Sequence, residues 1–370
     1  MIYQRKYLMI DNVKIVILLA FLLCFCTKVL SYPKLSSGSI ISSIHFCINI
    51  LVPSLFPFIF VSSFSIKSRL ASKLELIFMP LTKLFKLPMI CGTSVFLSYI
   101  GGYPCAAEGI KILLESNKIS IKQAERMLCF CICAGPAFII NVLGVSLLNN
   151  PKVGYILLLS HILSSVLIGI GCALFSNDDL KVNSSTDFNE ELQISEALIE
   201  STTGTSYSVI NMCSFVVLFS CILSIIKELN LLSIVYSFFE IFNVSRDNVY
   251  AIISLALEIS SGCLNAASLR ISPIILSFFL GFGGVCVQLQ ILSIFKGVNI
   301  SKLKFISFRF VHGILSSILT YFLFLLIPIT VTSGNIGYSH YFSEFAMSAG
   351  NIGSILLILL SVMFICDTKS

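Results

Sequence analysis

The first candidates for function are polar side chains that stand inside long apolar runs. Glu258, between Leu257 and Ile259, is the clearest case, because an acidic group in hydrocarbon must be neutral, paired or in contact with water. Three roles stay open for it: pairing with Arg270, carrying a coupling proton, or lying near a helix end. Amide groups in such runs can bind a solute or join two helices by a hydrogen bond. These amide candidates are Asn141, Asn265, Gln288 and Gln290.

A second feature is a break inside the apolar stretch at residues 88–107. Gly101-Gly102-Tyr103-Pro104 interrupts this stretch, and a proline inside a helix removes a backbone hydrogen bond. The freed backbone groups persist in a membrane only where they are buried or line a watery cavity. A helix that restarts at Pro104 leaves N–H groups pointing into the site, where they attract anions. We therefore predict an anion-facing half-helix here, with Tyr103 as a flat apolar wall.

Similar interruptions recur further along the chain. Gly135 and Pro136 interrupt the apolar stretch 127–148, and a glycine-rich segment at 281–284 interrupts the stretch 273–295. For 281–284, close helix packing by small residues is an equally good explanation.

The two halves of the chain also align with each other. An offset of 160 residues places the segment 101–110 on 261–270 and pairs Gly102 with Gly262. Paired broken helices in two halves are the best sequence pointer to the central binding site of a transporter.

The elements that hold these breaks must be membrane helices. Of the 370 residues, 56% are hydrophobic and 11% charged, whereas average soluble domains carry about 25% charged residues. Strand-built barrels show weaker, alternating segments, and the length gives room for about ten spanning helices. We predict an all-α polytopic integral membrane protein with inverted repeats and two broken or re-entrant helical hairpins, near 98–107 and 258–270.

Basic residues indicate which side faces the cytoplasm. Residues 66–86 carry five lysine or arginine side chains against one acidic one, and residues 1–14 are also basic, so both are predicted to be cytoplasmic. A span count puts the basic segment 296–309 on the other side, unless 231–244 or 249–269 is re-entrant. Arg309 is expected to be an interfacial anchor.

Several classes of function lack sequence support. The four histidines, at positions 45, 161, 312 and 340, form no HExxH motif, and most of the fourteen cysteines lie in apolar stretches without a CxxC pair. No GxSxG, P-loop or dinucleotide-binding pattern occurs. We therefore predict no enzyme activity, no cofactor, no metal site and no nucleic-acid partner. The expected partners are a small anionic solute and the lipid bilayer, and a homo-oligomer is left open.

At this point the residues resemble a known family. The chain resembles the nucleoside-recognition, or gate, domain, and most closely the sporulation integral membrane proteins of the YlbJ type. The residues that carry this resemblance are the run FLSYIGGYPCAAEGIKILLESNKISIKQAERMLCFCICAGPAFII. The segments LEISSG at 257–262 and GFGGVCVQLQILSIF at 281–295 are similar to the second repeat of that family, and the resemblance covers most of residues 38–330. Glu108 departs from a Lys in the family pattern, and Ile132-Cys133-Ala134 departs from a frequent Asn-Asn-Ser.

The resemblance implies a function as well as a fold. It implies an organisation similar to that of concentrative nucleoside transporters and, for the YlbJ type, transport of dipicolinate from the mother cell across the outer forespore membrane. Two alternatives stay open: transport of nucleoside-like solutes, or a non-transporting role in spore assembly. Dipicolinate is a small aromatic dianion, which suits N–H donors, one or two cations and a flat apolar wall.

The predicted organisation has five parts. They are an N-terminal membrane anchor (1–37), a first gate-type repeat (38–176), an acidic linker (177–206), a second gate-type repeat (207–332) and a C-terminal span (333–370). Within the first repeat, two short amphipathic helices at the membrane surface are expected after Glu108, with Ser120 and Gln123 as a capping box.

Overall fold

A computed structural model describes residues 15–16, 19–20, 22–68, 70–176, 193–228, 232–241 and 243–327. The regular elements within these ranges are helices, which confirms the all-α prediction. The basic residues 1–14, the first part of the predicted linker and the predicted C-terminal span (333–370) lie outside the described residues.

The first half follows a short apolar helix, Leu22–Ser31. Its elements are α2 (Pro33–Phe46), the π-helix η1 (Cys47–Leu51), α3 (Val52–Lys67), α4 (Leu70–Leu84), the 3₁₀ turn η2 (Met89–Cys91), α5 (Gly92–Gly101), α6 (Tyr103–Glu115), α7 (Ile121–Phe130), the π-helix η3 (Ala137–Leu147) and α8 (Pro151–Leu174). The predicted capping box is confirmed, since Ser120 N donates to Gln123 Oε1 at 2.8 Å and Gln123 N donates to Ser120 Oγ at 3.2 Å. Most residues of α7 are buried against other parts of the protein, and its place at the membrane surface stays a prediction.

The second half begins with the longest described helix. Its elements are α9 (Ile194–Glu228), α10 (Ser233–Glu240), α11 (Arg246–Leu257), α12 (Ile259–Ser268), α13 (Pro273–Phe282), α14 (Gly284–Ile294) and α15 (Lys302–Leu326). Because α9 starts at Ile194, the later part of the segment predicted as a linker is helical.

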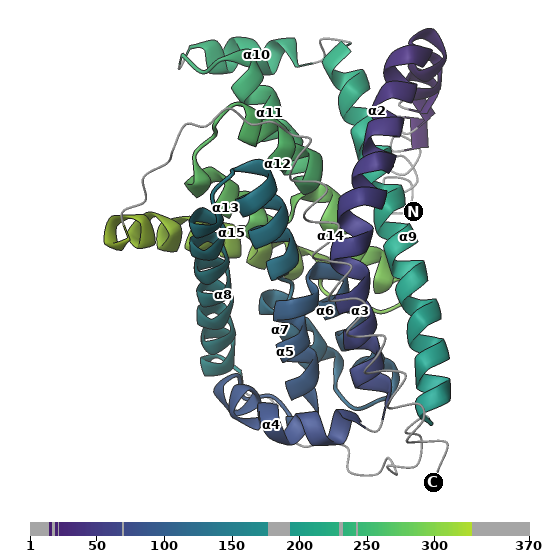
Figure 1. Ribbon diagram of the computed structural model, residues 1–370, viewed down its shortest axis with the longest axis vertical. Helices are drawn as coiled ribbons and strands as arrows, with labels where there is room; N and C mark the ends of the chain where they lie inside the picture. The colour runs from purple at the N-terminus through teal and green to yellow at the C-terminus, as the bar shows by residue number, and fades with distance from the viewer. Residues whose placement is uncertain are drawn as a thin grey trace, which may run out of the picture.

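The order of elements in the first half recurs in the second. Each half has a long helix, a lateral helix, two interrupted helix pairs and a final long helix: α3, α4, α5–α6, α7–η3 and α8, then α9, α10, α11–α12, α13–α14 and α15. Figure 1 shows α4 at the bottom of the molecule and α10 at the top. An inverted repeat places equivalent elements at opposite ends, so this arrangement agrees with the predicted inverted organisation.

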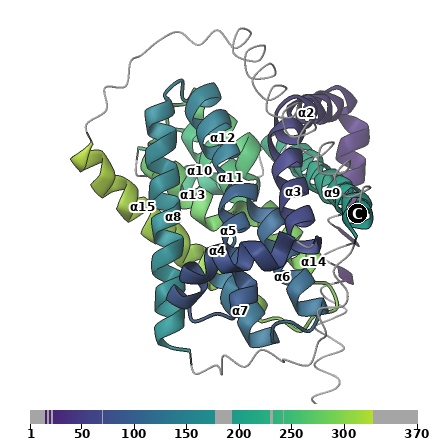
Figure 2. The ribbon, with the colours of Figure 1, turned by 60° about the horizontal axis from the view of Figure 1, so that its bottom comes forward.

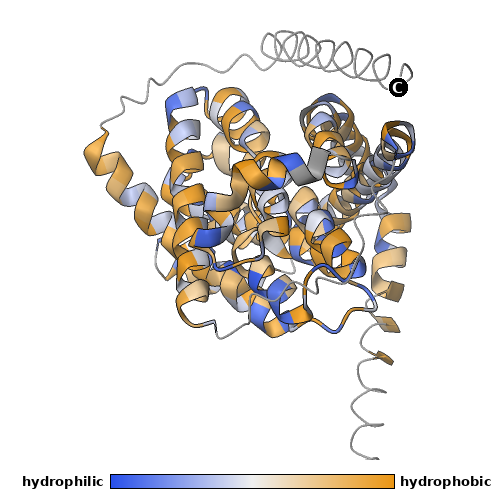
Figure 3. Cartoon of the chain, turned by 90° about the horizontal axis from the view of Figure 1, so that it is seen from below, coloured by the Kyte–Doolittle hydropathy of each residue, from blue (hydrophilic) through white to orange (hydrophobic). Residues whose placement is uncertain are grey.

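Among the described residues, four helical segments are long and apolar enough to cross a membrane, and a bent pair would add a fifth. They are Pro151–Leu174, Ile194–Glu228, Pro273–Ile294, Lys302–Leu326 and the pair Ser36–Leu51 with Leu55–Lys67, which is bent by 56°. This is fewer than the sequence allows, because the apolar stretches near 88–107, 127–148 and 249–269 are each interrupted. Most residues of the helices are apolar, as Figure 3 shows, which suits a protein of the bilayer.

Both predicted hairpins consist of two short helices that pack on each other. α5 and α6 meet at Gly102, whose φ of +82° is disfavoured for any residue with a Cβ. α11 and α12 meet at Glu258, which has extended backbone angles. The structural equivalent of Gly102 is therefore Glu258, and the alignment of Gly102 with Gly262 is wrong.

The two basic segments that a span count separates lie next to each other. Lys304 Nζ is 3.5 Å from Glu125 Oε2, and the adjacent Arg126 donates to the carbonyl oxygen of Lys86. The segments 66–86 and 296–309 thus share one side, as expected when the hairpin α11–α12 enters the membrane without crossing it.

The helices form two groups with a layer between them. Figure 2 shows α2, α3 and α9 on one side, α8 and α15 on the other, and α5, α6 and α7 between them. The interrupted helices therefore lie inside the molecule, where long helices on both sides cover them.

We expect Gly281→Val to destabilise the protein, because α13 and α15 cross closely. A Cβ at Gly281 would lie 2.6 Å from the backbone N of Gly313, and neither backbone can move easily. Overpacking of this kind costs about 1–3 kcal/mol. The measurement is the temperature at which the detergent-solubilised protein loses its monodisperse elution peak. Gly171→Val is the control, because a Cβ there has no neighbour within 4 Å, and equal stability of both variants would contradict the close crossing.

Candidate functional site

Interrupted helices from both halves meet at a small cavity, which we call the inner pocket. The first hairpin contributes Gly102, Tyr103 and Pro104, and the second contributes Glu258. The other lining residues are Leu51, Leu55, Ala134, Gly135, Phe138, Met212, Val216, Ile259, Ser260, Val287 and Gln290. Its volume of about 40 Å³ admits a few water molecules but no organic solute.

Two interrupted backbones touch at the inner pocket. A Cβ on Gly135 would lie 2.8 Å from the carbonyl oxygen of Ile100, and a Cβ on Gly102 would lie 3.3 Å from the backbone N of Gly135. The turn between α5 and α6 therefore crosses the loop between α7 and η3 in direct contact. Gly102 has no side chain with which to cap α6, so this helix starts beside the pocket without a side-chain cap.

Glu258 has the same position in the second hairpin but a different chemistry. Its side chain is buried, and its carboxylate caps α12 by accepting from Ser260 N at 2.8 Å, from Ser261 N at 2.7 Å and from Ser261 Oγ at 2.7 Å. Of the three roles left open for Glu258, the structure gives the position at a helix end. Arg270 is exposed beyond the other end of α12, away from this carboxylate.

Two predicted binding residues donate hydrogen bonds to backbone carbonyl groups at the break between α13 and α14. Tyr103 Oη donates to the carbonyl oxygen of Leu280 at 2.6 Å, and Gln288 Nε2 donates to that of Phe282 at 3.2 Å. These carbonyl groups lack helical partners because α13 ends at Phe282. The donors of Tyr103 and Gln288 therefore hold backbone rather than facing a free solute.

The loop after α7 is held by side chains of α8 and α15. Arg309 is fully buried and donates to the carbonyl oxygens of Ile132 and Cys129, the latter at 3.0 Å. Ser165 Oγ donates to the Phe130 carbonyl oxygen at 2.6 Å, and Ala134 N donates to His161 Nε2 at 2.9 Å. The expectation that Arg309 is an interfacial anchor is therefore wrong: it serves as a cap for α7 inside the protein.

Cys133, His161 and His312 form a buried cluster whose ligand atoms lie within 4.8 Å of one another. His161 Nε2 accepts the Ala134 N–H, so its proton is on Nδ1; His312 Nε2 lies 3.1 Å from the His161 carbonyl oxygen and donates to it. Only His312 then offers a free ring lone pair, and the Arg309 cation holds the neighbouring Ile132. This arrangement suits hydrogen bonding better than metal binding. Scattered as they are in sequence, the two histidines occupy equivalent places in α8 and α15.

A larger polar cavity, which we call the chamber, adjoins the inner pocket and shares Pro104, Met212 and Gln290 with it. It lies between α3, α6, α9 and α14 and has a volume of about 370 Å³, within the usual range for small-molecule sites. The other lining residues are Ser63, Lys67, Glu108, Lys111, Ile112, Glu115, Gly204, Tyr207, Ser208, Asn211, Ser293 and Ile294. A solute of dicarboxylate size therefore fits in the chamber but not in the inner pocket.

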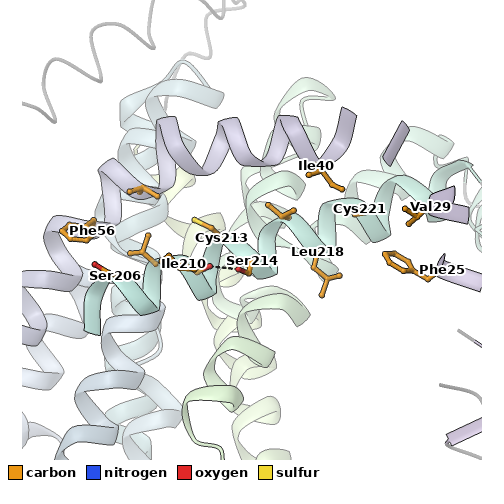
Figure 4. Close-up of a pocket in the computed structure, with 13 residues that line it drawn as sticks. Phe25, Val29, Ile40, Phe56, Ser206, Ile210, Cys213, Ser214, Leu218 and Cys221 are labelled. Atoms are coloured by element: carbon orange, nitrogen blue, oxygen red, sulfur yellow. Dashed lines mark hydrogen bonds between the residues drawn. The ribbon is translucent and has the colours of Figure 1, made fainter. Parts of the chain in front are cut away.

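A third cavity, of about 770 Å³, is an apolar groove between the helix Leu22–Ser31, α2, α3 and α9. Figure 4 shows side chains such as Phe56, Ile210 and Leu218 around it. Ser214 Oγ donates a hydrogen bond to the Ile210 carbonyl oxygen at 2.9 Å, so its proton does not face the groove. Because this groove offers mainly hydrocarbon contacts, the chamber is the candidate site for a polar solute.

The sequence-predicted residues divide into two groups. Those that line the inner pocket are Gly102, Tyr103, Pro104, Gly135, Glu258 and Gln290. Those that do not are Gly101, Pro136, Asn141, Gly262, Asn265, Arg270 and Gln288. Among the latter, Asn265 Nδ2 donates to Ser254 Oγ at 3.3 Å and so joins α12 to α11.

The sequence interpretation missed most of the chamber. Lys67 belongs to a segment that we interpreted only as a cytoplasmic anchor, and Glu108 was noted only as a departure from a family pattern. Asn211 carried a usable signal, because it is an amide inside an apolar stretch, like Asn141. Lys111 and Ser208 carried no such signal in the sequence, because their place in the chamber depends on how α6 packs near α9.

Comparison with known proteins gives one distant relative. The chain is 22% identical over 336 residues to the sporulation integral membrane protein YlbJ of Bacillus subtilis (strain 168), and the match covers 84% of this chain and 82% of that protein. No family model and no solved structure matches. The match supports the resemblance to the YlbJ type, while the resemblance to the nucleoside-recognition domain stays a prediction.

We expect Arg309→Met to be strongly destabilising, because it leaves two buried carbonyl groups without their donor. The loss should be about 2–5 kcal/mol, measured as a lower unfolding temperature in detergent. The control is Lys302→Met, an exposed position at the start of the same helix, which should change stability by less than about 0.5 kcal/mol. If Arg309→Met were as stable as this control, Arg309 would not be the cap that holds the loop.

Proposed function

We propose that this chain is a membrane transporter of a small organic anion, and that dipicolinate is its substrate during endospore formation. The observation that carries the proposal is the meeting of interrupted helices from both halves at the inner pocket, next to a chamber of solute size. Interrupted helices are costly in a membrane unless they are buried in protein or line a cavity, and paired breaks in two halves point to the central site of a transporter. On this proposal the protein binds and moves its solute without catalysing a reaction.

The chemistry of the chamber suits an aromatic dicarboxylate. Lys67 and Lys111 supply cations, Asn211 and Gln290 supply amide donors, and Tyr207 supplies a flat ring. Carboxylates form their strongest hydrogen bonds with charged donors, and an aromatic wall holds a planar ring. A nucleoside would use the amides and the ring but would make no use of the positive charge of the two lysines.

The position of the chamber favours uptake from the cytoplasm. Lys67 is the last residue of α3, directly before the basic helix α4, and basic segments of membrane proteins face the cytoplasm. Glu115 at the rim is 61% exposed, so the chamber is open at this end. Together with the sporulation name of the relative, this supports export from the mother cell across the outer forespore membrane.

Tyr103 and Glu258 close the path beyond the chamber. Tyr103 is bonded to Leu280 of the opposite half, and Glu258 is bonded to the first turn of α12. Passage of a solute requires these contacts to open, and alternating access by movement of one repeat against the other would open them.

The direct test is uptake by the purified full-length protein in lipid vesicles. We expect saturable uptake of radiolabelled dipicolinate and little uptake of a labelled nucleoside. Gly102→Val should abolish uptake while the protein stays inserted and monodisperse, because a β-branched side chain blocks the approach of backbone and solute. Gly38→Val is the control, since a Cβ at this exposed position of α2 meets no atom within 4 Å.

The outcomes separate the candidate functions. Uptake of the nucleoside alone would favour the gate-domain alternative, and uptake of neither solute by a correctly inserted protein would favour a non-transporting role in spore assembly. Normal dipicolinate uptake by Gly102→Val would show that the break at Gly102 is not part of the transport path.

A second prediction concerns Glu258. Glu258→Gln keeps the size of the side chain but loses the charge and one acceptor, so the cap on α12 weakens by about 1.5–3 kcal/mol and transport should fall about tenfold or more. Glu258→Asp can still cap the helix and should retain more transport. Wild-type rates in Glu258→Gln at every pH tested would show that this carboxylate has no part in transport.

A further inference from the structure

The chamber is lined by two cations, Lys67 and Lys111, and by two carboxylates, Glu108 and Glu115. Lys67 comes from α3, and Glu108, Lys111 and Glu115 come from successive turns of α6. A chamber built only to attract an anion would lack the two acids. With these acids present, the positive charge that an entering anion meets depends on whether the acids are ionised.

The lysines are held by partners at the rim. Lys67 Nζ is 3.3 Å from Glu200 Oε2, and the Glu200 side chain is 53% exposed. Lys111 Nζ is 3.5 Å from the exposed Glu115 and 2.5 Å from the Ile294 carbonyl oxygen. Exposed ion pairs of this kind contribute about 0–1 kcal/mol, so a solute carboxylate can replace these partners at little cost.

Glu108 differs from the other acids because it lies deep in the chamber. It accepts a hydrogen bond from Ser208 of α9, and it follows the uncapped start of α6 by little more than one turn. α6 lies outside the candidate spans, and burial raises the pKa of Glu108 to about 7, against the lowering effect of Lys67. This carboxyl group therefore exchanges its proton near physiological pH.

We propose that Glu108 is the acceptor of a coupling proton, so that the chain moves an organic anion together with a proton. The inference rests on the proposed function. With Glu108 ionised, its carboxylate competes with the solute for the charge of Lys67. When a proton from solution binds to the Glu108 carboxylate, the competition ends and a carboxylate of the solute takes its place.

The charged and titratable groups that face Glu108 are few. α3 supplies Lys67, and α6 supplies Lys111, Glu115 and the thiol of Cys105. α9 supplies Tyr207 and, behind Lys67, Glu200, and α14 contributes the neutral Gln290 and Ser293. Protonation of Glu108 leaves the lining with an excess of one positive charge. Adding a dianion beside Glu108 in turn favours its protonated form, so the binding of anion and proton is mutually reinforcing.

The test measures binding and uptake of radiolabelled pyridine-2,6-dicarboxylate by the full-length protein in vesicles at pH 6, 7 and 8. Both carboxyl groups of this probe are ionised throughout this range, as expected from carboxyl pKa values of about 4. A single group that titrates near pH 7 should weaken apparent affinity about tenfold between pH 6 and pH 8. Glu108→Gln, which mimics the protonated side chain, should bind well at all three values. Glu228→Gln, at the exposed far end of α9, should keep the wild-type pH profile.

A second measurement needs no variant. Mixing the wild-type protein with the dicarboxylate in weakly buffered solution at pH 7.5 should remove protons from the solution, up to about one per site. Anion uptake without proton uptake, or a Glu108→Gln protein that keeps the wild-type pH dependence, would overturn the inference and leave the proposed function intact. Absence of dicarboxylate binding at every pH would instead overturn the proposed function itself.

Discussion

The structure depends on how backbone groups freed at helix breaks find partners inside an apolar protein. Each such group would cost several kcal/mol in hydrocarbon, so a break must either bring its own donors and acceptors or face a cavity. The break before α12 uses the Glu258 carboxylate, and the break after α13 uses Tyr103 and Gln288. The loop after α7 uses Arg309 and His161. The buried polar residues of this chain are therefore explained first by the breaks, and only the remaining ones are free for a solute.

These hydrogen bonds also join the two halves. Tyr103, from the first hairpin, donates to Leu280 of the second half, and Arg309, from the second half, donates to Cys129 of the first. Because each half supplies the partners for a break in the other, neither can move without exchanging them. The same constraint that stabilises the interrupted helices thus links the state of the inner pocket to the relative position of the repeats.

Sequence reasoning found the breaks that glycine and proline mark, because these residues alter the backbone wherever they stand. It misplaced the second hairpin turn, since Glu258 breaks a helix by capping the next one, and an acidic residue in an apolar run does not by itself reveal this. The capping box at Ser120 could be predicted because its parts are close in sequence. The burial of Arg309 and the chamber around Lys67 could not, because they depend on packing between helices distant in sequence.

The two hairpins share a geometry but differ in charge, and this difference divides their tasks. The start of α12 is already occupied, because Glu258 accepts from its first N–H groups. The start of α6 follows Gly102, which has no side chain to offer, and Pro104 in its first turn lines both the inner pocket and the chamber. Of the two hairpins, only the first therefore presents a helix start without a side-chain cap, and a helix N-terminus favours negative charge. Recognition of the anion then belongs to the first repeat, while the second repeat, with its own carboxylate in place, forms the closed end that must yield before the solute can pass.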